Sequence, residues 1–218
     1  CCQLPIDLKR VTDTLSNLGQ SPNVGAALIV SLGCEGTDHE RLVEEIRGTG
    51  KPVEIIRIQE LGGTSRAIQA GIDAAQRLVQ EISAQQRETV DISNVIMAIK
   101  CGASDSTSGM ASNCVIGYVA DKLVDLGATV IFGETTEFLG GEHILARRAV
   151  GGENGPVGQK IYEIVDRMEK RAKSVGEDMR GGQPTPGNIA GGLSSIEEKS
   201  LGAIVKSGRR PIQGVLEY

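Results

Sequence analysis

The 218-residue sequence predicts a three-layer, Rossmann-like α/β protein with a mainly parallel sheet and a helical carboxyl-terminal part. Up to about residue 140, short runs rich in β-branched residues alternate with amphipathic stretches, as in parallel strands joined by crossover helices. From residue 141 onward the strand signal stops and helical patterns dominate. We therefore expect a single domain over residues 1–218, in which residues 1–140 form the sheet and residues 141–218 form a mainly helical cover.

The first two strands are expected at 23–33 and 52–58, where aliphatic residues form short runs. A helix at 37–50 should follow the first strand, because Thr37 and Glu40 have the spacing of a capping box and a glycine closes the segment. A longer helix is expected at 62–86. Its apolar positions recur at steps of three and four residues and are Ile68, Ile72, Ala75, Leu78 and Ile82.

Two further strands are expected at 90–100 and 128–134, with a polar loop at 98–113 and a helix at 114–127 between them. Beyond the sheet, the segments 142–150 and 158–176 predict helices. A glycine- and proline-rich loop then leads into a capped helix that begins at Ser194 or Ser195. The charged run at 197–200 on that helix is typical of a solvated helix face.

Composition excludes several classes of function. Aromatic residues make up 2% of the chain and the net charge is −5, which argues against stacking on bases and against binding a phosphate backbone. No apolar run approaches the ~18 residues of a membrane span and no signal segment opens the chain, so we expect a cytoplasmic protein. Its five cysteines, an odd number, favour reduced thiols or metal ligands. Because no initiator Met is present, we expect an excerpt of a longer polypeptide.

Polar and reactive side chains cluster after three of the expected strands, at 33–36, 101–109 and 133–143. Ligands of parallel sheets bind at the carboxyl ends of the strands, so we expect these clusters to line one crevice. The side chains concerned are Cys34 and Glu35, then Cys101, Ser104 and Asp105, and finally Glu134, Glu137, Glu142 and His143.

Several of these residues also have a purely structural interpretation. A lone cysteine is more often a small buried hydrophobic residue, which stays open for Cys34 and is the interpretation we adopt for Cys114 inside an apolar helix pattern. His39, in a first helical turn, is expected at the surface, whereas His143 is open between a site and a surface role. Cysteines at successive strand ends nevertheless fit soft ligands for iron or zinc, although close CxxC spacing is lacking.

Five segments occur along the chain in the order NVGAALIVSLGCEG, GGTSRAIQAGI, KCGASDSTSGMASN, GETTEFLGGEHILARRA and GNIAGGLSSIEEKSLG. Together they resemble the altronate and galactarate dehydratase family, which includes the large subunit of sulfolactate sulfo-lyase, and the resemblance covers nearly the whole chain. The family's usual forms read GLGCE, CGGSD, SETPE and GGLTTIEEKSLG. This chain departs from them at Ala103, Gly133, Thr136, Ser194 and Ser195.

The resemblance implies an iron-dependent lyase that removes a group β to the carboxylate of a 2-hydroxy acid. The implied iron ligands are Cys34, Cys101 and one of Cys1 and Cys2, of which Cys1 matches the family if a glycine precedes it. Three such ligands leave an open position for substrate. Both mononuclear Fe(II) and an iron–sulfur cluster remain possible with this set.

The same resemblance and the strand-end positions suggest roles for other residues. The expected catalytic residues are Glu134, Glu142, His143 and Lys100. The expected substrate-binding residues are Arg66 and Arg147 for carboxylates, and Ser104, Asp105, Ser108 and Asn113 for hydroxyls. The implied partners are a small hydroxy acid, an amino-terminal domain or small subunit that this chain lacks, and further copies in a homo-oligomer, with no nucleic acid and no membrane.

For the substrate we prefer sulfolactate, cleaved to pyruvate and sulfite. The substitutions at Gly133 and Thr136 indicate that the strand-end pocket has diverged from that of the sugar-acid enzymes. Two alternatives stay open. One is dehydration of altronate or galactarate, and the other is a non-catalytic binding domain of a larger enzyme.

Overall fold

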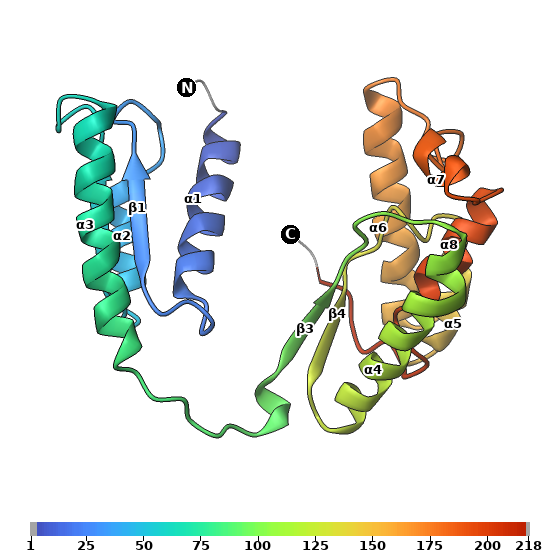
Figure 1. Cartoon of the computed structure of the whole chain (residues 1–218). Helices are drawn as coiled ribbons and strands as arrows, with labels where there is room; N and C mark the ends of the chain where they lie inside the picture. The colour runs from blue at the N-terminus through green and yellow to red at the C-terminus, as the bar shows by residue number, and fades with distance from the viewer. Residues whose placement is uncertain (1–3, 217–218) are drawn as a thin grey trace. The chain divides into compact units, whose positions relative to one another are not determined.

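The computed structural model describes residues 4–216, and Figure 1 labels its helices and strands. The chain divides into two compact units, residues 1–88 and residues 89–218. The first unit contains α1 (Pro5–Gln20), β1 (Ala27–Ser31), α2 (His39–Arg47), β2 (Val53–Arg57) and α3 (Thr64–Ser83). The second contains η1 (Ile92–Asn94), β3 (Ile96–Ile99), η2 (Ser108–Ser112), α4 (Asn113–Asp125), β4 (Thr129–Phe132), α5 (Glu142–Arg148), α6 (Pro156–Ser174), α7 (Pro186–Ala190) and α8 (Ile196–Val205).

All four expected strands are present, and they form two parallel pairs rather than one described sheet. β1 pairs with β2 from Ala27 opposite Val53, and β3 pairs with β4 from Ile96 opposite Thr129. Each pair is connected through a helix, α2 or α4, so each is a β–α–β arrangement. The α/β class is therefore confirmed, whereas the three-layer Rossmann-like sheet stays a prediction.

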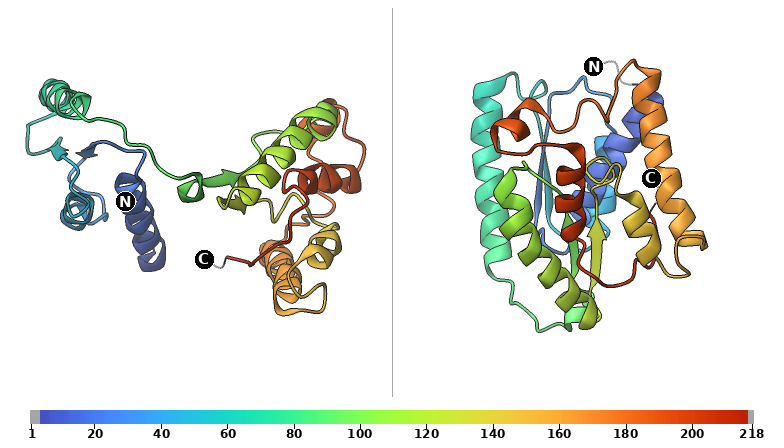
Figure 2. Two further views of the ribbon diagram at one scale, coloured as in Figure 1. Left: turned by 90° about the horizontal axis from the view of Figure 1, so that it is seen from below. Right: turned by 90° about the vertical axis from the view of Figure 1, so that its right-hand side faces the viewer.

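The first unit is layered, with helices on both faces of its two strands. Side chains alternate along a strand, so Ile29 and Ile55 pack against α2 while Leu28 and Ile56 pack against α3. Figure 2 shows α2 and α3 on opposite sides of β1 and β2 in its left view. The strands are short, and packing of both faces is what makes them part of a core.

Helix α1 is an element that the sequence did not lead us to expect. Its buried face includes Thr12 and Ser16, so the helix lacks an apolar stripe of ordinary strength. Ser16 hydrogen-bonds Glu45 of α2, and Arg41 of α2 lies 2.8 Å from Asp13. Polar contacts between α1 and α2 therefore replace the apolar periodicity that would have revealed this helix.

Two expectations about α2 and α3 were wrong. The cap of α2 is Asp38 rather than Thr37, because the Asp38 carboxylate accepts the Arg41 amide at 3.0 Å. The predicted apolar face of α3 is only partly buried, since Ile68 and Ile72 are 57% and 47% exposed. Of the predicted positions Leu78 is buried, and the other buried residues of α3 are Ala67 and Ala74. Small alanines face the strands and allow a close approach of helix to sheet.

The core of the second unit lies among its helices. Phe138, Leu139, Leu145, Ile161 and Ile204 are buried together there, from the segment after β4 and from α5, α6 and α8. Phe132 at the end of β4 stacks on Phe138 with ring centroids 5.8 Å apart. This core fixes the chain as it leaves β4, which is where the acidic cluster lies.

The polar segment 98–113 is less of a loop than expected. Its second half is the π-helical turn η2, which runs directly into α4. The glycine- and proline-rich segment after α6 likewise contains the short helix α7. Ser195 is the cap of α8, as expected, and accepts the Glu198 amide. Only half of the run at 197–200 is solvated, because Glu197 and Glu198 are exposed whereas Lys199 and Ser200 are 8% and 1% exposed.

The division into compact units at residue 88 places β3 and β4 together with the carboxyl-terminal helices. The single domain, with a sheet-forming part up to residue 140 and a helical cover after it, stays a prediction. Residues 83–96, which surround the boundary, are all exposed. Within residues 4–216, no helix combines the length and hydropathy that a bilayer crossing would need.

Candidate functional site

A cluster of charged side chains and a thiol lies at the carboxyl ends of β3 and β4. Lys100 and Cys101 follow β3, and Glu134 and Glu137 follow β4. The two strands are parallel, and the Gly133 amide extends their ladder by donating to the Ile99 carbonyl at 2.9 Å. The four side chains therefore meet at one edge, as the sequence predicted for this part of the site.

Glu134 is completely buried and lies between two lysines. Its Oε1 accepts a hydrogen bond from Lys206 Nζ at 2.7 Å, and the Lys206 side chain is itself only 6% exposed. Lys100 Nζ lies 3.9 Å from Oε2. Oε2 is buried and has no hydrogen-bond partner in the protein. A buried carboxylate oxygen without a donor is costly, so this atom is suited to a ligand.

Glu137 connects the lysine and the cysteine of the cluster. Its Oε1 accepts from Lys100 Nζ at 2.5 Å and from Cys101 Sγ at 3.3 Å, while Thr136 donates to Oε2 at 2.8 Å. Burial alone would raise the pKa of Glu137, but the hydrogen bonds from Lys100, Thr136 and Cys101 outweigh it and lower that pKa. The carboxylate therefore stays ionised.

Burial, followed by the hydrogen bond to Glu137, raises the pKa of the Cys101 thiol. Burial would lower the pKa of Lys100, but the contact with Glu137 reverses this effect and raises it. The cluster without a bound cation thus holds an ammonium, a thiol and two acidic side chains. A metal ion would bind the thiolate, so its binding must release the Cys101 proton.

Cys101, Glu134 and Glu137 are the single group of three possible metal-ligating side chains found within residues 4–216. One ligand atom from each lies within 4.8 Å of the others. A thiolate and two carboxylates form a mixed sulfur and oxygen donor set that suits a divalent transition metal. The unpartnered Oε2 of Glu134 agrees with this use of the group.

The segment after Cys101 is held by its own polar residues. Asp105 Oδ1 accepts from the Ser108 amide at 2.8 Å and from Thr107 Oγ1 at 2.7 Å. The Thr107 hydroxyl, followed by the Ser108 amide, holds the pKa of Asp105 below its usual range. Asn113 is buried and donates to the Gly202 carbonyl at 2.8 Å. These contacts give Asp105, Ser108 and Asn113 a structural task, and their binding of substrate hydroxyls stays a prediction.

The candidate residues on α5 are not members of the Cys101 group. Glu142 lies 3.6 Å from Arg180 Nη2, and its Oε2 is buried without a hydrogen-bond partner. Arg147 pairs with Glu153 at 3.2 Å. His143 is half-buried on the same helix. Glu142 and His143 are therefore not part of the possible metal-ligating group, and the proposed roles of Glu142, His143 and Arg147 stay predictions.

The remaining candidates belong to the first unit. Cys34 follows β1 and is an exposed free thiol, so the buried-hydrophobe interpretation does not apply to it. Arg66 lies in the first turn of α3 and is exposed. Cys1 and Cys2 lie outside the described residues. The convergence of these residues with Cys101 stays a prediction.

Glu35 organises the turn that presents Cys34. Its carboxylate accepts the amides of Leu32, Gly33 and Cys34 at 2.9, 2.7 and 3.0 Å. Backbone hydrogen bonds, first from its own amide and from that of Gly33, hold the pKa of Glu35 far below its usual range. His39 Nε2 lies 3.0 Å from the same carboxylate, and its side chain is 14% exposed, which corrects the expected surface position. Glu35 is thus a structural residue of this turn.

Cys114 was expected to be a buried helix residue, and this was wrong. It is exposed, and its thiol donates to the Gly109 carbonyl at 3.3 Å. The π-helical turn before α4 changes the face that the cysteine presents, which an ideal 3.6-residue period does not anticipate.

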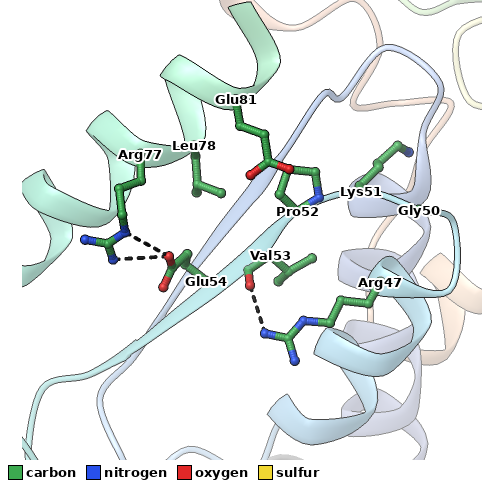
Figure 3. A pocket seen from close by; sticks show the side chains of 9 residues that line it. All are labelled: Arg47, Gly50, Lys51, Pro52, Val53, Glu54, Arg77, Leu78 and Glu81. Atoms are coloured by element: carbon green, nitrogen blue, oxygen red, sulfur yellow. Dashed lines mark hydrogen bonds and ion pairs between the residues drawn. The ribbon is translucent and has the colours of Figure 1, made fainter. Parts of the chain in front are cut away.

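A shallow pocket of about 520 Å³ lies at the other end of the first unit's strands (Figure 3). It is lined by residues that precede and begin β2 and by parts of α2 and α3. Its cationic groups already have protein partners. Lys51 binds the carbonyls of Gln20 and Ser21, Arg47 binds that of Val53, and Arg77 pairs with Glu54. This pocket is therefore a poor candidate for a substrate carboxylate.

Family models account for both units. Residues 1–83 match the D-galactarate dehydratase/altronate hydrolase second domain, and residues 92–218 match the D-galactarate/altronate dehydratase carboxyl-terminal domain. The chain belongs to the D-galactarate/altronate dehydratase family. Family membership confirms the resemblance seen in the sequence motifs.

The relatives that the chain resembles are named for different reactions. The chain is 40% identical over 99% of its length to a (2R)-sulfolactate sulfo-lyase subunit beta of Chromohalobacter salexigens. It is 35% identical over 93% of its length to a galactarate dehydratase (L-threo-forming) of Escherichia coli, and 31% identical over its whole length to an altronate dehydratase of Bacillus subtilis. It covers 54%, 39% and 43% of these three relatives, so it spans about half of their length or less.

One residue of the β3–β4 cluster was missing from the predicted site, and another was placed there without a role. Lys206 comes after the last recognised motif and gave no sequence signal of its own. Glu137 was placed at a strand end but received no role. The signal that could have found Glu137 is its spacing, since Glu134 and Glu137 are three residues apart at the end of a strand.

Proposed function

We propose that this chain is part of an iron-dependent lyase that eliminates a group β to the carboxylate of a 2-hydroxy acid. The observation that carries the proposal is the buried Glu134, which lies between Lys206 and Lys100 and beside Cys101 and Glu137. Opposite charges, a thiol and an unpartnered carboxylate oxygen meet there at the carboxyl end of two parallel strands. Membership of a family of dehydratases supports the reaction class.

Elimination from a hydroxy acid requires removal of a weakly acidic proton next to a carboxylate. Bound iron would supply Lewis-acid stabilisation of the negative charge that develops on that carboxylate. Cys101, Glu134 and Glu137 would hold the ion. The family resemblance also implies Cys34 and one of Cys1 and Cys2 as ligands. Lys100, 55% exposed at the cluster, would attract the anionic substrate and neutralise charge as the leaving group departs.

The proton-transfer roles are proposed for Glu134 together with Lys100, and for Glu142 and His143 as the second pair. Burial and a free oxygen favour Glu134, whereas its position within the possible metal-ligating group favours a ligand role. Substitution separates these roles. Glu134→Gln should abolish turnover and lower bound iron together if Glu134 is a ligand, but should lower turnover alone if it transfers a proton.

For the substrate we propose sulfolactate, cleaved to pyruvate and sulfite. Thr136, which replaces the family's usual proline, donates a hydrogen bond to Glu137 and so changes the surroundings of a cluster carboxylate. The 40% identity to a sulfo-lyase subunit supports this choice over the dehydratases at 35% and 31%. Dehydration of galactarate or altronate is the second candidate, because the same α-proton chemistry serves both.

The test uses the full-length enzyme with its amino-terminal domain or small subunit, prepared anaerobically with iron. Sulfolactate, galactarate and altronate are supplied separately, and free sulfite and 2-keto acid are measured. Sulfite from sulfolactate supports the proposal. If galactarate or altronate gives 2-keto acid and sulfolactate gives no sulfite, the enzyme is a sugar-acid dehydratase and the sulfolactate proposal is wrong. A sugar acid or sulfolactate that binds without turnover would indicate the non-catalytic binding domain.

Iron is tested independently of turnover. Bound iron and acid-labile sulfide are measured in anaerobically prepared enzyme, in Cys101→Ser and in Glu137→Gln. Both variants should lose most of the iron. Cys114→Ser is the matched control, since Cys114 is a free exposed thiol of the same unit, and it should retain the iron of the unsubstituted enzyme. Full iron content in the first two variants would exclude this ligand set.

A further inference from the structure

Lys199 is a buried lysine with neutral partners. Its side chain lies on α8, its exposed fraction is 8%, and its ammonium donates to Asn188 Oδ1 at 2.8 Å and to Gln183 Oε1. Burial of an ammonium costs free energy unless its hydrogen bonds are satisfied. Two amide oxygens accept these hydrogen bonds here. The buried ammonium therefore orients two amide side chains and does not form an ion pair with them.

The ammonium fixes the orientation of the Asn188 amide. A lysine can only donate, so the atom of Asn188 that faces it must be the oxygen. The same oxygen also accepts the Thr185 amide at 3.2 Å. The amide nitrogen is thereby directed away from Lys199, and it donates to the Ser104 carbonyl at 2.9 Å.

Ser104 belongs to the segment that follows Cys101, and the contact with Asn188 is one of several at this place. The Ser106 amide donates to the Gly191 carbonyl at 3.1 Å. A Cβ at Gly191 would lie 2.9 Å from Asp105 Cβ, and one at Gly192, whose φ is 97°, would lie 2.9 Å from Ser106 Oγ. Glycines therefore let segments 104–106 and 188–192 approach each other closely.

We propose that Asn188 and Lys199 are positioning residues that hold the segment 101–108 in place at the cluster of Cys101, Glu134 and Glu137. Lys199 orients Asn188, and Asn188 holds the Ser104 carbonyl, three residues after Cys101. The effect on catalysis rests on the proposed lyase function, whereas the effect on the segment does not. Their side-chain hydrogen bonds go to Gln183, Thr185 and Ser104, so they act through the backbone that carries Cys101.

Asn188→Asp is the decisive variant. Aspartate keeps an oxygen for Lys199 and for the Thr185 amide, but it places a second oxygen, in place of a donor, against the Ser104 carbonyl. Amide hydrogen exchange of peptides within 101–108 should therefore accelerate about tenfold or more, while exchange in α6 stays unchanged. Alkylation of Cys101, measured by mass spectrometry in the iron-free chain, should accelerate relative to Cys34 and Cys114.

The matched control is Asn94→Asp. Asn94 also donates its side-chain amide to a backbone carbonyl, that of Asp91 at 3.1 Å, but it lies in η1. It should leave exchange within 101–108 unchanged. Lys199→Met should also accelerate exchange within 101–108, because the Asn188 oxygen then keeps only the Thr185 amide as a donor, and Lys199→Arg should restore most of the protection.

In the full-length enzyme Asn188→Asp should lower kcat about tenfold or more and change KM less, because a displaced segment impairs chemistry more than binding. Exchange within 101–108 that stays within twofold of the unsubstituted chain would overturn the proposal, as would accelerated exchange with an unchanged kcat. If the unsubstituted enzyme turns over none of the acids, the proposed function fails, and the exchange experiment still decides whether Asn188 holds the segment.

Discussion

At the scale of single residues, Glu134 and Lys206 form a buried ion pair. Both side chains are buried, at 0% and 6% exposure, and their charged atoms are 2.7 Å apart. A buried ion pair adds little net stability, because desolvation offsets the attraction. Removing one partner is different, since it leaves the other charge buried and unpaired. Such a pair is therefore better explained by a role in the site than by stability.

Lys206→Met should lower the free energy of unfolding by about 3 kcal/mol, because Glu134 then keeps only the more distant Lys100 as a counter-charge. Urea denaturation of the whole chain, followed by circular dichroism, measures the change. The double variant Lys206→Met with Glu134→Gln should recover a large part of the loss, since the unpaired charge is gone.

The control for this prediction is Lys170→Met. Lys170 pairs with Asp166 on α6, but the two side chains are 75% and 58% exposed, so the change should stay within about 0.5 kcal/mol. Equal decreases in the free energy of unfolding for Lys170→Met and Lys206→Met would show that burial of the Glu134–Lys206 pair does not increase the cost of breaking it.

At the scale of elements, α4 and α8 pack unusually closely at Gly117. A Cβ added there would lie 2.1 Å from the Val205 carbonyl oxygen, and 3.3 Å from the Gly208 amide nitrogen. The obstacle is backbone, which cannot rotate away as a side chain can. A glycine at this position of α4 is therefore required by the approach of α8, which carries Lys199.

Gly117→Ala should destabilise the chain by about 1–3 kcal/mol, because the two helices must separate. At Gly71 on α3 the expected change in stability has the opposite sign, since a Cβ there would meet nothing within 4 Å. Gly71→Ala should stabilise the chain by up to about 1 kcal/mol through helix propensity. Thermal and urea unfolding measure both changes. A stabilising Gly117→Ala would contradict the close packing of α4 and α8.

An ion pair joins the segment after α8 to α4. Arg210 binds Asp125 at the end of α4 through two contacts of 2.6 Å, and it lowers the pKa of that carboxyl. Because the pKa is lower in the folded state, the stabilisation is present above the unfolded pKa of about 3.9 and is lost as pH falls through the folded value.

Asp125→Asn should therefore reduce the urea midpoint at pH 7, and the difference from the unsubstituted chain should shrink as the pH is lowered below about 4. Each variant is compared with the unsubstituted chain at the same pH and salt concentration. A difference that stays constant between pH 7 and pH 3 would exclude the ion pair as its cause.

At the scale of the whole molecule, the two units are connected by exposed chain. Residues 83–96 are all exposed, and residues 85–91 form neither helix nor strand. Proteases require such accessible, irregular backbone. Brief treatment with trypsin should therefore cut first after Arg87 and give fragments 1–87 and 88–218, which mass spectrometry identifies.

Arg87→Gln is the control for this cleavage, since it removes the trypsin site and leaves the connecting segment in place. It should delay the first cut and move it elsewhere. A first cut after Lys100 in the unsubstituted chain would show that the start of the segment held by Asn188 is opened more readily than the connection between the units.

Much of the fold was predictable because its elements depend on local patterns. The four strands, α4 and the Ser195 cap of α8 have strong signals, namely aliphatic runs and a hydroxyl residue before a helix. Helix α1 was not predictable, since its buried face carries Thr12 and Ser16. The division into compact units at residue 88 was not predictable either, because it depends on where contacts between residues are few.

The candidate site shows the same distinction. Cys101 and Glu134 could be predicted as neighbours, because strand ends of a parallel pair share one edge. Lys206 could not, because it comes 72 residues after Glu134 and reaches it through the packing of α8. Lys199 was mistaken for a solvated residue, because charge usually marks the surface and only the contacts with Gln183 and Asn188 explain its burial.

The sequence by itself determined the family, the alternation of strands and helices, and the concentration of thiols and acids at strand ends. These properties depend on residue types and on short spacings along the chain. The tertiary structure alone decided which charges are buried, that Lys206 completes the surroundings of Glu134, and that Asn188 holds the segment after Cys101. The physical reason is that pairing between distant residues depends on how helices pack, and an apolar period shows which face of a helix is buried but not which distant residue that face meets.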